Sequence, residues 1–320
     1  MVFHTAGIEV APWLPPLVAL GISFFTSMGG VSGAFLLLPF QMSVFGYTNP
    51  SVSATNQLYN IVAIPSGVYR YHKEGRMVWP LTWIVVSGTL PGVFLGAFVR
   101  VAYLPDPRNF KLFAAVVLAY MGLKMIYDLW EKNANGADGA SSEERFEELV
   151  CAYRQQSDDS STAQLPSLPA VQITHFDHKR LGYSFYGETF NVPFWGLLAL
   201  SFVVGIVGGI YGIGGGAILA PFFVAFFGLP VYTVAGAALM GTFVTSVAGV
   251  AFYHAIAPLY PHLSVAPDWP LGILFGLGGM CGMYLGARCQ KFVPATAIKW
   301  MLAGIIVFTA LRYIAAFLGY

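Results

Sequence analysis

Two long stretches of this sequence are almost free of charged residues. No Asp, Glu, Lys or Arg lies between Val10 and Tyr69, and Asp268 is the only one between Thr189 and Ala287. An ordinary soluble domain has about 25% charged residues, whereas this chain has 10%. Runs of about 20 apolar residues match a bilayer core about 30 Å thick. We therefore predict an all-α, polytopic integral membrane protein, with the lipid bilayer as its surroundings.

Charge and cysteine content exclude several classes of function. The formal net charge is +1, which gives no electrostatic basis for binding nucleic acid. Cys151, Cys281 and Cys289 lack metal-ligand spacing, and an odd number of cysteines is no disulfide framework. We therefore expect no metal and no cofactor. No basic segment precedes the first apolar run, so we expect that run to stay in the membrane and not to be cleaved.

The apolar stretches lie on either side of one polar segment. They fall at about 12–46, 50–70, 78–99, 110–129, 194–228, 231–257, 269–288 and 297–318. The segment between the two groups is acidic, so we expect a solvated, partly disordered linker with a short helix around Ser142–Gln155. The predicted organisation is a first membrane repeat at 1–130, a linker at 131–190 and a second membrane repeat at 191–320.

The two halves match residue by residue. An offset of 182 aligns one set of positions, and an offset of 190 aligns a set nearer the end of each half. The clearest pairs are Pro39 with Pro221, Tyr71 with Tyr253, His72 with His254, and Trp79-Pro80 with Trp269-Pro270. Many ordered matches with few gaps indicate two tandem repeats of four to five helical segments. Secondary transporters are often built from repeats, with the substrate site where the halves meet.

The first apolar stretch of each half fits neither one membrane span nor two. As one helix, residues 12–46 would be about 50 Å long, which is too long for one span and too short for two. Glycines cluster in its middle and in the equivalent part of the second half, at Gly29, Gly30, Gly33, Gly212, Gly214, Gly215 and Gly216. Each glycine weakens a helix by about 1 kcal/mol relative to alanine. We predict a glycine-broken first helix in each half.

Such a break would favour an anion. Backbone N–H groups at a break are tolerated in a membrane only where they are buried in protein or line a wet cavity. The helix that restarts there points its N–H groups and its positive dipole end at that cavity. We therefore predict that these glycines and Ser32 bind substrate, with Pro39 and Pro221 as structural residues. Alternatively, the glycines only permit close helix packing.

The second glycine cluster has a recognisable pattern. Gly212-x-Gly214-Gly215-Gly216-x-x-x-x-Pro221 resembles the glycine signature of the sulfite exporter TauE/SafE family, also called the 4-toluene sulfonate uptake permease family. Tyr71-His72-x-x-Gly75-x-x-x-Trp79 resembles the segment that follows the second helical stretch in that family. The likeness covers both halves but not the linker, and Ser32-Gly33-Ala34 departs from the glycine pattern. The resemblance implies transport of sulfite, sulfonates or other sulfur-containing organic anions.

Uncharged polar residues follow in the next stretch of each half. Asn56 and Asn60 are four residues apart and share a helix face, with Gln57 beside them. The equivalent stretch of the second half carries Thr242, Thr245 and Ser246. Uncharged donors can hold an anion and still release it, so we expect all six residues to line the path. The alternative is hydrogen bonding between helices, worth about 0.6 kcal/mol per contact.

Four basic or titratable residues lie near the ends of apolar stretches, namely His72, His254, Lys124 and Arg312. We expect gating or electrostatic attraction of the anion from them; interfacial anchoring and snorkelling are the alternatives. No Asp or Glu lies well inside an apolar stretch. An inside-negative potential drives an anion outward by about 2.3 kcal/mol per charge per 100 mV. We therefore expect export, or channel-like release, without carboxylate-mediated proton coupling.

Two other functions were weighed. Gly30-x-Ser32-Gly33 matches the pattern around the serine of rhomboid-type intramembrane proteases, but that chemistry needs a histidine within hydrogen-bond reach. A receptor or scaffold with the linker as its interaction arm is the second alternative. We favour a non-enzymatic permease in a bacterial inner membrane, acting on a small sulfur-containing anion, and leave monomer or homodimer open.

Topology stays open at this stage. Eight spans would make the repeats parallel, and ten spans, with each broken stretch a hairpin, would make them inverted. By the positive-inside rule, a loop holding Lys73 and Arg76 fits only ten spans, whereas a loop holding Arg100 and Arg108 fits only eight.

Overall fold

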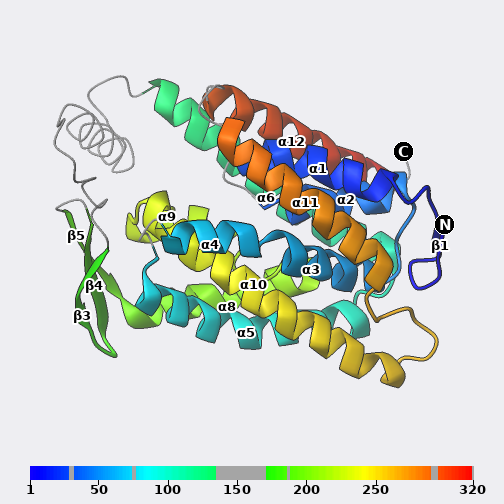
Figure 1. The fold of residues 1–320 in the computed structure, drawn as a ribbon, viewed down its shortest axis with the longest axis horizontal. Coiled ribbons are helices and arrows are strands. Elements are labelled where there is room, and N and C mark those ends of the chain that lie inside the picture. Colours follow the sequence, from blue (N-terminus) through cyan, green and yellow to red (C-terminus); the bar gives the residue numbers. More distant parts are fainter. Residues whose placement is uncertain (29–31, 74–76, 135–170, 186–187, 290–294, 319–320) are drawn as a thin grey trace.

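The chain folds into an elongated helical bundle, seen in a computed structural model that describes residues 1–28, 32–73, 77–134, 171–185, 188–289 and 295–318 (Figure 1). The helices of the first half are α1 (Leu14–Met28), α2 (Ala34–Val44), α3 (Ser51–Ala63), α4 (Pro65–Lys73), α5 (Trp79–Ala102) and α6 (Pro107–Ala134). Those of the second half are α8 (Phe194–Tyr211), α9 (Leu219–Phe227), α10 (Val231–Ile256), the 3₁₀ turn η2 (Ala257–Leu259), α11 (Trp269–Cys289) and α12 (Ala295–Leu318).

Six of the described helices are long and apolar enough to cross a membrane, and these lie in α5, α6, α8, α10, α11 and α12. The apolar helices α1 and α2 are shorter. Large hydrophobic side chains face outward on the outer pair α6 and α12, among them Leu123 and Phe308. Exposed apolar residues are stable there because lipid tails surround them. The predicted all-α, polytopic membrane fold is confirmed.

The first helix of each half packs against the other half. Helix α1 lies beside α11, and α8 lies beside α5. Glycines every fourth residue make both contacts close: a Cβ at Gly278, Gly282 or Gly286 would lie under 3.0 Å from the backbone of α1. The same spacing recurs at Gly88, Gly92 and Gly96 of α5 against α8. Small residues that let helix backbones approach are a general device of membrane helix packing.

The equivalent helices α3 and α10 meet at the centre and run in opposite directions. Gln57 lies against Gly249, and Asn60, three residues later on α3, bonds Ser246, three residues earlier on α10. The outer pair α6 and α12 is also antiparallel, since Arg108 bonds Phe317 whereas Gly122 packs on Val307. The two halves are therefore inverted relative to each other. These contacts follow the pattern of an inverted duplication, although the duplication itself remains an inference from the sequence.

Each broken stretch is a helical hairpin. In the second half, Gly208 packs against Gly214, and Gly196 packs against Phe227, so α9 returns alongside α8. In the first half, Gly33 at the start of α2 lies against Ser23 in the middle of α1. With α3 and α4 counted together, the described part of each half has five helical segments. The described residues therefore have the hairpins of the ten-segment arrangement, with α2 and α9 shorter than the six helices that are long enough to span a membrane.

The last part of the predicted linker is a small antiparallel sheet, where the linker composition predicted only a solvated, partly disordered segment. Its strands, in the order β3-β4-β5, are β3 (Gln172–Phe176), β4 (Arg180–Phe185) and β5 (Glu188–Pro193). The hydroxyls of Tyr183 and Thr233 lie 2.8 Å apart and fix the sheet to α10. The helix predicted around residues 142–155 lies outside the described residues. A two-stranded hairpin, β1 (Val2–Phe3) with β2 (Ile8–Glu9), precedes α1.

The bundle has two distinct ends. Both termini lie at one end, and the three-stranded sheet lies at the other (Figure 1). We call these the terminal end and the sheet end. Helix α5 begins at the sheet end, where α4 stops, and ends at the terminal end, where the chain turns into α6 (Figure 1).

Candidate functional site

The predicted break in the second half is present between α8 and α9. Helix α8 stops at Tyr211, and the N–H groups of Gly212 and Ile213 both bond the carbonyl of Gly208, at 2.9 and 3.1 Å. Gly212 has φ +85° and Gly214 has φ +80°, conformations that L-residues with a side chain rarely adopt. The glycine signature therefore ends α8 by a left-handed turn and reverses the chain.

The break in the first half lies between α1 and α2, and Gly29 and Gly30 fall outside the described residues. Gly33 has φ −57°, so positive φ does not explain it. Its role is close packing, because a Cβ there would collide with the hydroxyls of Tyr59 and Ser23, which lie 2.7 Å from each other. The alternative reading of these glycines as packing residues thus holds at this position.

Asn56 joins the two breaks. Its Nδ2 donates to the carbonyl oxygens of Ala34, at the start of α2, and of Gly212, at 3.0 Å each. Gln41 Nε2 donates to Asn56 Oδ1 at 3.4 Å. These contacts join α3 to α2 and to the residue that follows α8, and Asn56 itself is fully buried. Asn56 thus satisfies the Gly212 carbonyl, which follows the end of α8, and adds a second donor to the Ala34 carbonyl, which is already bonded within α2.

Asn60 makes the same kind of contact one turn further along α3. Its Nδ2 donates to the carbonyl of Ile213 at 2.9 Å and to Ser246 Oγ at 3.3 Å. Helix α10 contributes Thr245, whose Oγ1 accepts the Gly215 N–H at 3.0 Å. Thr242 packs against Gly216, because a Cβ added at Gly216 would collide with the Thr242 hydroxyl. The structure therefore brings the predicted residues of α3 and α10 together around the second break.

The donors and acceptors around this break are unevenly used. The asparagine amides bond carbonyl oxygens, and Thr242 and Thr245 donate to the carbonyls of Ala238 and Gly241 in their own helix, at 2.8 and 2.6 Å. By contrast, the N–H groups of Gly214 and Gly216 have no acceptor among the described residues. Among the described residues, these two backbone N–H groups are therefore unpaired, whereas the side-chain nitrogens of Asn56 and Asn60 already bond carbonyl oxygens.

Unpaired buried side-chain atoms gather in the same region. Within the described chain they are Ser32 Oγ, Gln41 Oε1, both amide atoms of Gln57, Asn60 Oδ1 and Arg100 Nη2. Each belongs to the first break, to α3, or to a side chain hydrogen-bonded to α3. Because buried polar groups are normally paired, this concentration marks the region as one suited to a polar ligand and not only to packing.

The other predicted residues lie away from the breaks. His72 and His254 are exposed, and the inversion of the halves puts them at opposite ends of the bundle. His72 lies edge-on to Trp79, with ring centroids 5.8 Å apart. Arg312 is exposed on α12, and Lys124 is half-buried on α6. The structure does not bring these four residues to the centre.

The two predicted structural prolines each lie within the returning helix of a hairpin. Pro39 is buried within α2, and its carbonyl accepts a hydrogen bond from Tyr313 at 3.0 Å. Pro221 lies within α9.

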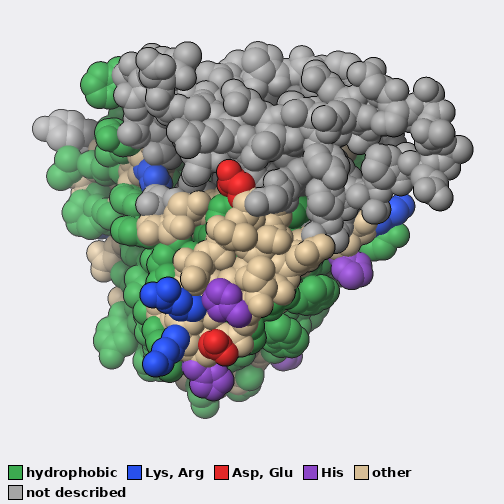
Figure 2. Space-filling view, turned by 90° about the vertical axis from the view of Figure 1, so that its left-hand side faces the viewer, with side chains coloured by type: hydrophobic (Ala, Val, Ile, Leu, Met, Phe, Trp, Pro, Cys, Tyr) green, Lys and Arg blue, Asp and Glu red, His purple; other side chains and the backbone are tan. Residues whose placement is uncertain are grey.

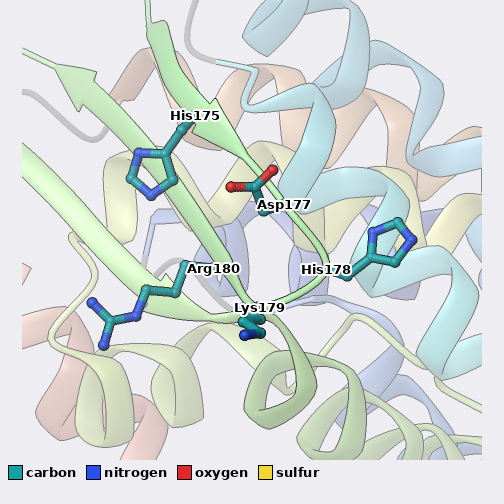
Figure 3. A pocket seen from close by; sticks show the side chains of 5 residues that line it. All are labelled: His175, Asp177, His178, Lys179 and Arg180. Carbon is teal, nitrogen blue, oxygen red and sulfur yellow. The ribbon is translucent and has the colours of Figure 1, made fainter.

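One surface hollow lies away from the breaks. It has a volume of about 560 Å³ and lies at the β3–β4 turn, lined by His175, Asp177, His178, Lys179 and Arg180. Figure 2 shows basic and histidine side chains gathered on this end of the molecule, and in Figure 3 the five side chains fan apart. No group of three or more His, Cys, Asp or Glu suited to a metal occurs in the described ranges. We do not assign the hollow as the functional site.

Comparison with known proteins fits the architecture. The family model for the sulfite exporter TauE/SafE family matches residues 16–313, which is nearly the whole chain. The chain belongs to the TauE/SafE family. This assignment confirms the resemblance carried by the glycine and Tyr-His motifs, and it makes the protein a member of a membrane transporter family. Searches of curated proteins and of solved structures gave no significant match.

One candidate residue of this TauE/SafE protein was missed by the sequence analysis. The place of Arg100 in the sequence near Arg108 predicts a loop charge, which by the positive-inside rule favours eight spans. The structure places it in the last turn of α5, fully buried, with its guanidinium carbon 3.7 Å from the centre of the Phe110 ring. Because Arg100 is not in a solvated loop, the positive-inside rule does not apply to it. A lone basic residue inside a glycine-rich span was the available signal.

Ser32 has none of the contacts that a protease would require. Its Oγ has no hydrogen-bond partner in the part of the chain that the structure describes. The histidines that end the apolar stretches, His72 and His254, are exposed at the two ends of the bundle. A serine nucleophile needs a base within hydrogen-bond reach, and the described histidines do not provide one.

Proposed function

We propose that this protein is a permease that moves a small sulfur oxyanion, sulfite or an organosulfonate, out across the bacterial inner membrane. The observation that carries the proposal is the position of Asn56 and Asn60, which meet both interrupted hairpins where the two halves join. Substrate sites of secondary transporters commonly lie at the interface of inverted repeats and use interrupted helices. The family membership supports the same class of function.

The chemistry of the site suits an anion that must be released. Amide, hydroxyl and backbone N–H donors bind an oxyanion more weakly than charged donors do. The free N–H groups of Gly214 and Gly216 lie beside the hydroxyls of α10. The amides of Asn56 and Asn60 bond the carbonyls of Gly212 and Ile213. An anion bound beside them would compete with these carbonyls for the amide N–H groups. That exchange would couple binding to movement of the α8–α9 hairpin against α3.

The one acid of the second apolar region serves a structural role. Asp268 precedes α11, and its carboxylate accepts the N–H groups of Leu271 and Ala6, at 3.1 and 3.2 Å. A carboxylate used as a helix cap is stabilised there by the first turn. Asp268 therefore does not offer a free carboxylate for carrying protons, which supports export driven by the membrane potential.

Basic residues favour the sheet end as the cytoplasmic end. Lys73 is the last residue of α4, Arg288 lies in the last turn of α11, and Lys299 is the fifth residue of α12. All three of these helix ends are at the sheet end (Figure 1). Arg108 lies at the terminal end, at the start of α6, but the sheet end carries more basic residues, since Lys179 and Arg180 lie in its β3–β4 turn. By the positive-inside rule the sheet end therefore faces the cytoplasm, and both termini then face the periplasm.

Reconstituted vesicles test the proposal. Proteoliposomes loaded with ³⁵S-sulfite should release it faster than protein-free liposomes, and a potential negative inside, set with potassium and valinomycin, should accelerate release. Methanesulfonate and sulfate, tested as competitors, define the substrate class. Release that depends on a proton gradient and ignores the potential would contradict uncoupled export. No release of any sulfur oxyanion would overturn the proposed function.

A further inference from the structure

Arg100 is a buried cation in the membrane part of the protein. It lies in the last turn of α5, has no exposed surface, and stacks on Phe110. Its Nη1 donates to the Leu104 carbonyl, and its Nε donates to Ser53 Oγ at 3.4 Å. These contacts hold the plane of the guanidinium between the α5–α6 turn and α3.

The charge of Arg100 is not neutralised by the protein as described. No carboxylate forms an ion pair with it among the described residues, and both N–H groups of its Nη2 have no partner. Burying an unpaired charge is costly, and basic residues within membrane segments usually pair or line an aqueous pathway. A guanidinium with two free donors is suited to an oxyanion, which can bridge neighbouring N–H groups.

The arginine is connected to the second break through one side chain. Ser53 Oγ lies 3.4 Å from the carbonyl of Tyr211 and 3.5 Å from that of Ile210, at the end of α8. Asn56 follows Ser53 by one helical turn on the same helix. An anion that leaves the Asn56 region toward the terminal end would therefore meet Arg100 next.

The arginine belongs to only one half. The offset of 190 that aligns Gly96 with Gly286 places Gln290 opposite Arg100. Because the two halves are inverted, the position equivalent to Arg100 belongs to the opposite end of the bundle. The residue there in the sequence is uncharged, so the positive charge occurs only at the terminal end. The site is thereby asymmetric across the membrane.

We propose that Arg100 is an anion-binding site at the terminal end of the transport pathway, where its Nη2 receives the sulfur oxyanion on its way out. The inference rests on the proposed function. It adds to the uncharged donors at the breaks one charged donor, Arg100, further along the pathway. Ser53 and Phe110 are positioning residues, because they orient the guanidinium without needing to touch the anion.

Binding by purified variants tests this site. Arg100→Gln should weaken sulfite binding, measured by calorimetry in detergent at constant ionic strength, by about 10- to 100-fold, as expected for loss of a charged hydrogen bond. The affinity of Arg100→Lys should lie between those of the wild type and Arg100→Gln, because lysine keeps the charge but lacks the paired N–H donors of a guanidinium. The matched control is Arg108→Gln, which removes an exposed arginine stacked on Phe317 and should leave binding unchanged.

Chemical labelling of the wild-type protein gives a second test that needs no variant. Phenylglyoxal modifies accessible arginines, so in transporting proteoliposomes sulfite should slow modification of Arg100 and leave that of Arg108 unaltered. Failure of Arg100 to react, or equal modification with and without sulfite, would overturn the inference. A sulfite affinity of Arg100→Gln equal to that of the wild type would also overturn the inference. If the wild-type vesicles release sulfite in either case, the proposed function stands; if they release no sulfur oxyanion, both fall.

Discussion

Asn56 Nδ2 lies 3.0 Å from the carbonyl oxygen of Gly212, a residue 156 positions later in the chain. The same nitrogen donates to the Ala34 carbonyl at the equivalent distance. One side chain of the first half therefore bonds a carbonyl of each interrupted hairpin. An anion that binds Asn56 would have to compete with these two hydrogen bonds.

Replacing Asn56 by alanine should harm both folding and transport. The buried Gly212 carbonyl would lose its side-chain donor, and the Ala34 carbonyl would keep only its bond within α2. An unsatisfied buried group costs about 1–3 kcal/mol. We expect a clear fall in the melting temperature of the detergent-solubilised protein and loss of sulfite efflux. Asn49→Ala is the control, because the side chain of Asn49 bonds the N-terminal segment and Ser51 but neither break. Unchanged stability in Asn56→Ala would contradict the structural role given to this amide.

Gly212→Ala should prevent the α8–α9 hairpin from closing. The position has φ +85°, which costs about 1–2 kcal/mol for a residue with a side chain. In addition, the new Cβ would collide with the backbone of Ser53. Gly304→Ala is a matched control, since a Cβ at Gly304 meets nothing within 4 Å and alanine favours a helix. Expression and melting temperature of the two variants should therefore differ sharply.

Gln57→Leu should separate function from stability. Both amide atoms of Gln57 are buried without a partner, so an apolar side chain of similar size should be neutral or stabilise by about 1 kcal/mol. If Gln57 contributes to the anion pathway, efflux should nevertheless fall. A variant as active as the wild type would show that this amide does not line the path.

Cysteine labelling should establish the orientation. In a background without native cysteines, Lys73→Cys reports the sheet end and Tyr103→Cys the terminal end, and both native side chains are exposed. A membrane-impermeant maleimide added to intact cells should modify position 103 and spare position 73. Lysing the cells should expose position 73, which controls for its reactivity. The reverse pattern would place the sheet in the periplasm.

Local features of the sequence predicted much of the fold. The charge-free stretches predicted membrane helices, and the cluster from Gly212 to Gly216 predicted where α8 would stop. Both predictions depend on properties of neighbouring residues, namely hydropathy and the conformational freedom of glycine. The sheet at 172–193 was missed because its strands are short and partly exposed, and their anchor, the contact of Tyr183 with Thr233, is not a local feature.

The sequence by itself determined that this chain is a membrane protein, that α8 ends at the glycine cluster from Gly212 to Gly216, and which polar residues lie on one face of α3. Only the tertiary structure decided that the halves are inverted, that the amides of Asn56 and Asn60 face carbonyl oxygens, and that Arg100 is buried beside Ser53. The physical reason is distance along the chain. Hydropathy and backbone strain act locally, whereas the partner of a buried donor is set by which helices pack together, often more than a hundred residues apart.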